Sequence, residues 1–224
     1  VGYGLKFEMC EKINVLGTKN MAQEAIDSGI KRFIHMSSVA VYGRQNKGKI
    51  TEETSYLKIG DPYGDTKIDA EVVLKDMKGQ LDITYIRPTV IYGPGDEKFL
   101  PKLIENIKSG SIKTIGNGKN KVDLIHIDDV CRFIKLILTD ERSYSQAYNL
   151  ANSKNGNWHE FLTFLSGQLE INSTIKSIPY PVAYCLATAM EATSKITNRP
   201  PKLTRYAVRV VGKSYNFVTE KSKK

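Results

Sequence analysis

Apolar positions along the chain recur with helical and with strand-like spacing, which predicts helices alternating with buried strands. A helix is expected over 5–28, where one face carries Met9, Ile13, Leu16, Met21 and Ala25. A strand is expected over 30–36, because its apolar core suits burial on both faces of a sheet. Further strands are predicted at 82–87, 112–115, 122–127, 148–151 and 215–217, and further helices at 62–77, 96–109, 128–138, 158–169, 181–193 and after 205.

The helix at 62–77 brings two reactive side chains together. Asp61 is a good N-cap and Pro62 a good first helical residue, so the helix is expected to begin here. Tyr63 and Lys67 are four residues apart and therefore lie side by side on this helix. A fixed cation beside a phenol favours the phenolate, which makes Tyr63 a candidate acid and base near neutral pH. A lone Y-x-x-x-K is common by chance, and an ordinary helix surface is the alternative.

Two flanking motifs give this helix a context. Upstream lies F-I-H-M-S-S-V-A-V-Y-G at 33–43, and downstream lies Y-I-R-P-T-V-I-Y-G-P-G at 85–95. A strand ending in serines, a Y-x-x-x-K helix and a strand ending in R-P-x-x-I-Y-G-P-G, in this order and spacing, resemble the extended short-chain dehydrogenase/reductase family. That family includes NAD-dependent sugar epimerases, dehydratases and 3β-hydroxysteroid dehydrogenases. The N-V-L-G-T stretch at 14–18 and the V-D-L-I-H segment at 122–126 are similar to further segments of the family.

The resemblance implies a role for several residues. Tyr63 would be the general acid and base, Lys67 would depress its pKa and hold the nicotinamide ribose, and Ser38 would bind the substrate oxygen. Ser38 is preferred to Ser37 because the family's active hydroxyl lies five residues before the glycine that is Gly43 here. The cofactor, NAD with NADP left open, would contact Asn14, Met36, Ser37, Tyr63, Lys67, Pro88 and Val90. The small-molecule substrate would contact Ser38, Val39 and Tyr92.

Departures from the family's patterns narrow the reaction. Val39 and Ala40 stand where the sugar dehydratases carry Asp-Glu, and neither side chain moves a proton, so dehydration is not expected. Val122 stands where nucleotide-sugar epimerases place an arginine on the substrate diphosphate, although Lys119 or Lys121 is an alternative cation. The stretches 116–123 and 200–205 resemble the 3β-hydroxysteroid dehydrogenase branch. We therefore expect an enzyme that transfers a hydride between nicotinamide and a secondary alcohol or ketone. One alternative is a nucleotide-sugar 4-epimerase or reductase, and another is a non-catalytic binding protein on the same scaffold.

The resemblance implies an α/β fold: an incomplete Rossmann-like, doubly wound parallel sheet with a small C-terminal substrate-binding lobe. Residues 1–95 and 122–150 would form the NAD-binding domain, and 96–121 with 151–224 the lobe. No Gly-rich strand–turn–helix that grips a dinucleotide pyrophosphate is found in the sequence, so the chain resembles a fragment without that N-terminal element.

Composition adds little to this picture. The net charge of +9 comes mostly from scattered lysines without a nucleic-acid motif, so nucleic acid is not expected as a partner. The three cysteines, Cys10, Cys131 and Cys185, have neither disulfide-framework nor metal spacing, and they predict free thiols and a cytoplasmic location. His126 and Asp128 are read as a helix start, with Asp128 as N-cap, rather than as metal ligands. The apolar stretch 178–192 leaves a weak membrane-surface contact open. A homodimer is suggested by the resemblance alone.

Overall fold

The structure, a computed structural model, describes residues 6–43, 48–152, 156–171, 175–197, 201 and 203–223. The chain forms two compact units. Unit 1 comprises Val1–Ile91, Ile125–Ser153 and Asn216–Lys224, and unit 2 comprises Tyr92–Leu124 and Lys154–Tyr215. Residues 216–224 belong to unit 1 by this division. The assignment of the two parts to cofactor and substrate stays a prediction.

Unit 1 is built on a parallel sheet. Its strands are β1 (Arg32–Met36), β2 (Asp82–Pro88) and β6 (Ala147–Leu150), in the order β1-β2-β6. The pairs β1–β2 and β2–β6 are both parallel, with His35 opposite Tyr85 and Arg87 opposite Asn149. Because parallel strands end at the same edge, residues that follow β1, β2 and β6 gather at one side of the unit.

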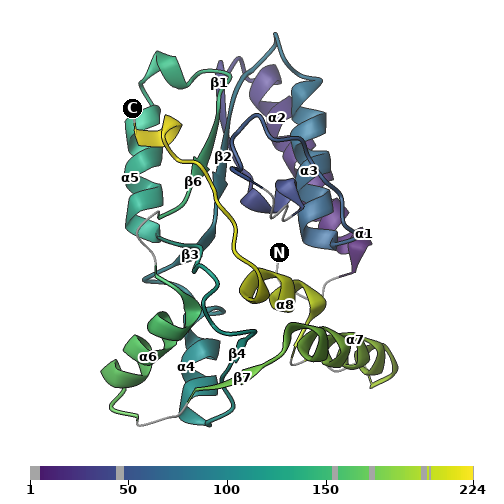
Figure 1. Cartoon of the computed structure of the whole chain (residues 1–224). Coiled ribbons are helices and arrows are strands. Elements are labelled where there is room, and N and C mark those ends of the chain that lie inside the picture. The colour runs from purple at the N-terminus through teal and green to yellow at the C-terminus, as the bar shows by residue number, and fades with distance from the viewer. Residues whose placement is uncertain are drawn as a thin grey trace. The chain divides into compact units, whose positions relative to one another are not determined.

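Helices cover both faces of this sheet (Figure 1). The helices α2 (Gly17–Asp27) and α3 (Pro62–Lys75) lie on one face, where Ala22 and Leu74 pack with Ile83 of β2. The helix α5 (Ile127–Ile137) covers the other face, where Val130 packs with Ile86. The predicted α/β, doubly wound arrangement with parallel strands is therefore confirmed for unit 1.

The first helical region differs from its prediction in two ways. It consists of α1 (Phe7–Glu11), a π-helical segment η1 (Lys12–Leu16) and α2, instead of one regular helix. The predicted apolar face is also divided in the structure: Met9, Ile13, Leu16 and Met21 are 52%, 53%, 51% and 64% exposed, whereas Ala25 is 7% exposed. The buried side of this region carries small and polar side chains instead: Cys10, Asn14, Ala22 and Ala25. Small residues allow the helix to approach its neighbours closely.

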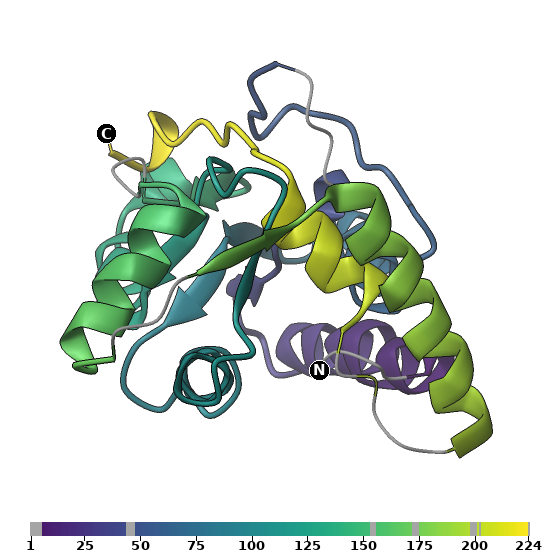
Figure 2. The same cartoon turned by 60° about the horizontal axis from the view of Figure 1, so that its bottom comes forward.

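Unit 2 combines short strands with four helices among its described residues. The strands β4 (Lys113–Ile115) and β7 (Lys176–Ile178) pair in parallel, and β7 was not predicted. The helices α7 (Tyr180–Thr197) and α8 (Arg205–Gly212) lie side by side in both ribbon views (Figure 1, Figure 2). Ile115, Ala183, Ala187 and Val208 form the core beneath them. The other two helices are α4 (Leu100–Lys108) and α6 (Trp158–Gln168).

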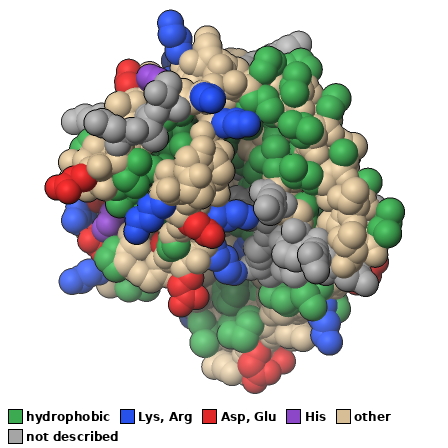
Figure 3. Space-filling model, turned by 90° about the horizontal axis from the view of Figure 1, so that it is seen from below, with side chains coloured by type: hydrophobic (Ala, Val, Ile, Leu, Met, Phe, Trp, Pro, Cys, Tyr) green, Lys and Arg blue, Asp and Glu red, His purple; other side chains and the backbone are tan. Residues whose placement is uncertain are grey.

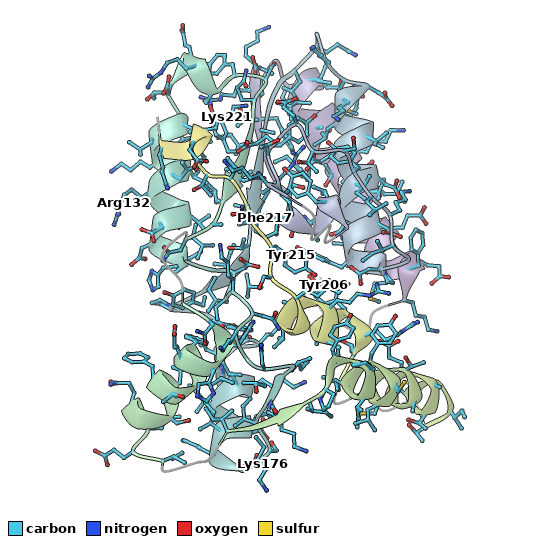
Figure 4. All side chains as sticks on the ribbon, in the orientation of Figure 1. Arg132, Lys176, Tyr206, Tyr215, Phe217 and Lys221 are labelled. Atoms are coloured by element: carbon cyan, nitrogen blue, oxygen red, sulfur yellow. The ribbon has the colours of Figure 1, made fainter. Side chains whose placement is uncertain are left out.

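Three smaller expectations need correction. The N-cap of α5 is His126, whose ring Nδ1 accepts a hydrogen bond from the Asp128 backbone, so Asp128 lies inside the first turn. The expected strand at 215–217 is reduced to one bridge between Phe217 and Ile50. The polar, turn-rich stretch 43–60 predicts a surface loop, and among residues 48–60 only Ile50 departs from this, being 1% exposed, whereas the others are half-buried or exposed. Figure 4 labels Phe217 and Lys221 on the C-terminal segment that makes these contacts with unit 1.

Candidate active site

Ser38 lies directly after β1, at the start of a tight turn. The turn is the 3-10 helix η2 (Val39–Tyr42), and Ser38 is its N-cap: its Oγ accepts a hydrogen bond from the Ala40 backbone at 3.1 Å. The residue is 9% exposed, and Val39 beside it is 3% exposed. The hydroxyl is thus held at the carboxyl end of the sheet, where ligands of open α/β sheets bind.

The first turn of α3 packs against this serine turn. Asp61 caps α3, as predicted, by accepting a hydrogen bond from the Gly64 backbone at 2.8 Å. A Cβ on Gly64 would come within 3.2 Å of the Ala40 carbonyl oxygen, so glycine permits the close approach. Tyr63, the neighbour of Gly64, is half-buried at this contact. The structure therefore brings the turn of Ser38 and the helix start that carries Tyr63 together.

Lys67 connects α3 to the end of β1. Its Nζ donates a hydrogen bond to the carbonyl oxygen of Met36 at 2.8 Å. Burial lowers the pKa of Lys67, and the nearby Glu71 carboxylate acts in the opposite direction. The ammonium group is therefore held at Met36, which lies two residues before Ser38 in the sequence. Lys67 itself lies about one helical turn after Tyr63 on α3.

Asn14 belongs to the same cluster, but through a contact that the sequence did not predict. It lies in the π-helical segment η1, is 6% exposed, and donates from Nδ2 to Thr66 Oγ1 at 2.9 Å. Thr66 in turn donates to the carbonyl oxygen of Pro62 at 2.6 Å. π-helical turns occur often at functional sites, and this one points its buried amide at the first turn of α3.

The other residues expected at a cofactor occupy the ends of β1 and β2. Met36 is 37% exposed, whereas Ser37 and Pro88 are buried. Val90 is half-buried at the start of β3 (Val90–Tyr92). Between the last two, Thr89 Oγ1 is buried without a hydrogen-bond partner among the described residues. This hydroxyl was not singled out from the sequence, and it lies at the same end of the sheet as the residues above.

Tyr92 and Val122 line a hollow of about 340 Å³ within unit 2. The rest of its wall consists of the apolar side chains of Leu124, Phe161 and Phe164, together with Gly156 and Glu160. Neither a lysine nor an arginine lines the hollow in the part of the chain that the structure describes. Lys119 and Lys121 are exposed and lie outside this wall.

His35 is a packed histidine of β1. It is 6% exposed and its ring meets Tyr85 edge-on, with 6.3 Å between ring centroids. Burial lowers the pKa of His35 to about 4, so the ring is neutral at physiological pH. Among the described residues, no three His, Cys, Asp or Glu side chains converge as metal ligands, and no helix is long and apolar enough to cross a bilayer.

Sequence comparison identifies the family. Residues 7–151 match the NAD dependent epimerase/dehydratase family. The chain therefore belongs to this family of extended short-chain dehydrogenases/reductases. The match includes η1, both serines after β1, the Tyr63–Lys67 helix and β6, which are the elements that meet at the carboxyl end of the sheet.

Individual relatives carry different activities in their names. The chain is 30% identical over 229 residues to the 3beta-hydroxysteroid-dehydrogenase/decarboxylase isoform 2 of Arabidopsis thaliana, covering 94% of this chain and 41% of the relative. It is 29% identical over 203 residues to the N-acetyl-alpha-D-glucosaminyl-diphospho-ditrans,octacis-undecaprenol 4-epimerase of Escherichia coli O157:H7, covering 88% of this chain and 58% of the relative. The chain thus spans about two fifths to three fifths of the length of these curated relatives.

Solved structures show the same fold. The dTDP-glucose 4,6-dehydratase DesIV of Streptomyces venezuelae, solved with NAD bound, superposes with a TM-score of 0.63 at 28% identity. The match covers 75% of this chain and 54% of that one. A UDP-glucose 4-epimerase of Thermotoga maritima matches all of this chain with a TM-score of 0.71 at 20% identity, which supports the fold alone.

Proposed function

We propose that this protein is an NAD(P)-dependent oxidoreductase that moves a hydride between nicotinamide and a secondary alcohol or ketone. The observation that carries this proposal is the cluster at the carboxyl end of β1. There the turn of Ser38 packs on the helix start of Tyr63, and Lys67 is bonded to Met36. Membership of an NAD-dependent family supports the cofactor.

Each group has a distinct chemical task in this proposal. Tyr63 gives or takes the proton of the substrate oxygen, and the Lys67 ammonium favours its phenolate form. Ser38 hydrogen-bonds the same oxygen and stabilises charge that develops on it. The nicotinamide, when bound, supplies the hydride acceptor or donor. The proposed cofactor contacts are Asn14, Met36, Ser37, Tyr63, Lys67, Pro88 and Val90.

We infer an apolar or uncharged alcohol, hydroxysteroid-like, as the substrate class. The support is the apolar lining of the hollow at Tyr92 and Val122, whose described residues include no lysine or arginine that could bind a diphosphate. Val39 would be a further substrate contact. The second candidate is a nucleotide-sugar 4-epimerase or reductase. It is supported by the similarity to the undecaprenol 4-epimerase of Escherichia coli O157:H7. A non-catalytic binding protein on the same scaffold is the third candidate.

A cofactor-reduction assay separates the three candidates. The protein is incubated with NAD or NADP and a panel of hydroxysteroids, other secondary alcohols and UDP-sugars. Absorbance of the reduced nicotinamide is followed for the alcohols, and the UDP-sugars are separated by chromatography, because epimerisation leaves no net reduced cofactor. Turnover of an uncharged alcohol supports the proposal. Epimerisation of a UDP-sugar, together with inhibition by UDP, supports the second candidate. Cofactor binding without turnover of any compound supports the third.

A homodimer through α1, η1 and α3 is also proposed. Its basis is an exposed apolar stripe on the first helical region. Phe7, Met9, Ile13 and Leu16 line one side of the first helical region, and Val72 is an exposed apolar residue of α3. The helices α1 and α3 are neighbours within unit 1, so the two apolar surfaces can form one patch. A second copy of this chain is the proposed occupant, because a two-fold interface pairs the same patch with itself.

A weak contact of α7 with an anionic membrane surface is the other proposed association. Val182, Leu186 and Ile196 of this helix are 48%, 44% and 83% exposed. Figure 3 shows hydrophobic side chains gathered on the side where α7 lies. In the sequence from 175 to 215 the basic residues far outnumber the single acidic one, Glu191: Lys176, Lys195, Arg199, Lys202, Arg205, Arg209 and Lys213. Apolar area and positive charge together favour anionic lipid. Sedimentation with anionic but not neutral vesicles would support this contact.

A further inference from the structure

A buried ion pair lies beneath the candidate active site, and the proposed chemistry does not use it. Arg87 of β2 meets Glu71 of α3 through two bonds, Nε to Oε1 at 3.0 Å and Nη2 to Oε2 at 2.6 Å. The side chains of Arg87 and Glu71 are 4% and 0% exposed. An apolar pair of similar size is often as stabilising as a buried ion pair, so stability alone does not account for these two charges.

The pair is bonded to both ends of the turn that carries Ser38. At the start, Ser37 Oγ donates to Glu71 Oε1 at 2.5 Å. At the end, Arg87 Nη1 donates to the hydroxyl of Tyr42 at 2.8 Å. Tyr42 is 0% exposed and donates onward to Asn149 Oδ1 at 2.7 Å, which fixes its ring. Residues 37 and 42 are therefore held by one guanidinium–carboxylate unit.

Glu71 also shares a helix face with the proposed catalytic groups. Tyr63, Lys67 and Glu71 follow one another at intervals of four residues along α3. Lys67 bonds Met36, the last residue of β1, and Glu71 bonds Ser37, the next residue, so consecutive turns of α3 are matched to consecutive residues at the end of this strand. A slip or rotation of α3 against the turn would have to break both bonds.

Protonation does not weaken the pair near neutral pH. Burial raises the pKa of Glu71, but hydrogen bonds and charge from Arg87, with bonds from Ser37 and Tyr56, more than offset this and hold that pKa below its usual value. Burial lowers the pKa of Arg87, and the Glu71 carboxylate raises it by more. Both groups thus stay charged, and the two parallel hydrogen bonds between the Arg87 guanidinium and the Glu71 carboxylate are kept.

We propose that Glu71 and Arg87 are positioning residues, which fix the turn of Ser38 in register with the face of α3 that carries Tyr63 and Lys67. The catalytic consequence rests on the proposed function. Loss of this register displaces the hydroxyl from the phenol, and a displacement of about 1 Å costs about 10²-fold in rate.

A matched pair of hydroxyl deletions tests the proposal. Tyr42→Phe removes a hydroxyl that Arg87 holds on the Ser38 turn. Tyr56→Phe removes a hydroxyl that also bonds this pair, receiving from Arg87 Nη2 at 3.1 Å and donating to Glu71, but that lies outside the turn. Arg87→Lys is the stronger variant, because lysine keeps the charge and loses the fork. All three are compared with the wild-type protein by thermal unfolding, kcat and KM.

We expect Tyr42→Phe to lower kcat severalfold and Arg87→Lys to lower it by about 10²-fold, with KM changed less than twofold. Tyr56→Phe should keep the wild-type kcat. Equal kcat values for Tyr42→Phe and Tyr56→Phe overturn the proposal, even where Arg87→Lys does not fold. So does a folded Arg87→Lys protein with wild-type kcat.

A second readout does not depend on turnover. The pH at which Tyr63 loses its proton is followed by NMR of protein carrying ¹³Cζ-labelled tyrosine, with Tyr63→Phe to assign the signal. We expect that pH to rise in Tyr42→Phe and Arg87→Lys and to stay constant in Tyr56→Phe. If the wild-type protein turns over no alcohol, the oxidoreductase function fails while this shift still supports positioning. No shift in either variant overturns positioning, whatever the activity.

Discussion

The Lys67 ammonium group donates a hydrogen bond to the carbonyl oxygen of Met36 at 2.8 Å. This contact joins α3 to the end of β1, because Met36 is the last residue of the strand and Ser38 follows two residues later. The bond therefore holds α3 against β1, and it also fixes a cation one helical turn from Tyr63, the proposed acid and base.

Replacing Lys67 should impair catalysis more than folding. Lys67→Met keeps the aliphatic stem and removes the charge and the bond to Met36, so we expect kcat/KM to fall by about 10²- to 10³-fold. The pH optimum should move to higher pH, since the phenolate of Tyr63 is no longer favoured. Lys75→Met, on the same helix but at an exposed position, is the control and should leave the profile unchanged. An unshifted pH profile in Lys67→Met would contradict the electrostatic role.

His35 should make the protein less stable in acid. Its pKa is lowered by burial to about 4, whereas an unfolded histidine titrates near 6.5, so between these values the unfolded chain binds more protons. The free energy of unfolding therefore falls as pH drops from about 6.5 to about 4, by roughly 3 kcal/mol in total. His35→Phe should remove this part of the slope in urea titrations at several pH values. An equal slope in both proteins would contradict it.

Gly43 should tolerate no side chain. It ends η2 with φ of 56°, and a Cβ there would lie 2.1 Å from the Leu57 carbonyl oxygen. Gly43→Ala is expected to destabilise the protein by about 3 kcal/mol or more, from left-handed strain plus the overlap. Gly29 also has a positive φ, of 71°, but open space around it, so Gly29→Ala should cost about 1–2 kcal/mol. Equal losses in the two variants would show that the contact with Leu57 is absent.

The exposed stripe on the first helical region should control assembly. Ile13→Glu introduces charge at a side chain that is 53% exposed, so the fold should keep its stability while a dimer dissociates. Asn20→Glu adds the same charge at an exposed polar position of α2 and should leave the assembly intact. Sedimentation velocity measures both. A wild-type protein that is monomeric at high concentration would remove the basis for the proposed dimer.

Local chemistry predicted more of this molecule than periodicity did. Asp61 and Pro62 specified the start of α3, and the spacing of Tyr63 and Lys67 on it follows from helix geometry. In contrast, the period of Met9, Ile13 and Leu16 identified a helix but did not indicate which of its sides is buried. Periodicity groups residues on one side of a helix and does not state which side is covered, and here small residues face the core.

The contacts beneath the site had no local signal. Glu71 and Arg87 are 16 residues apart on different elements, and only the packing of α3 on β2 brings them together. The hydrogen bond between Asn14 and Thr66 spans 52 residues in the same way. β7 consists of three residues, Lys176–Ile178, which is too short for an alternating pattern. Such features become visible only when the tertiary arrangement is known.

The proposed role of Tyr63 as acid and base is tested most directly by measuring hydride transfer in a protein that lacks only the Tyr63 hydroxyl. Tyr63→Phe and wild-type protein are loaded with NAD and mixed with an alcohol that the wild type oxidises, and reduced nicotinamide is recorded in a single turnover. We expect the rate of hydride transfer in the Tyr63→Phe protein, at saturating NAD, to be lower by about 10²- to 10⁴-fold. A Tyr63→Phe protein that transfers hydride at the wild-type rate would contradict it.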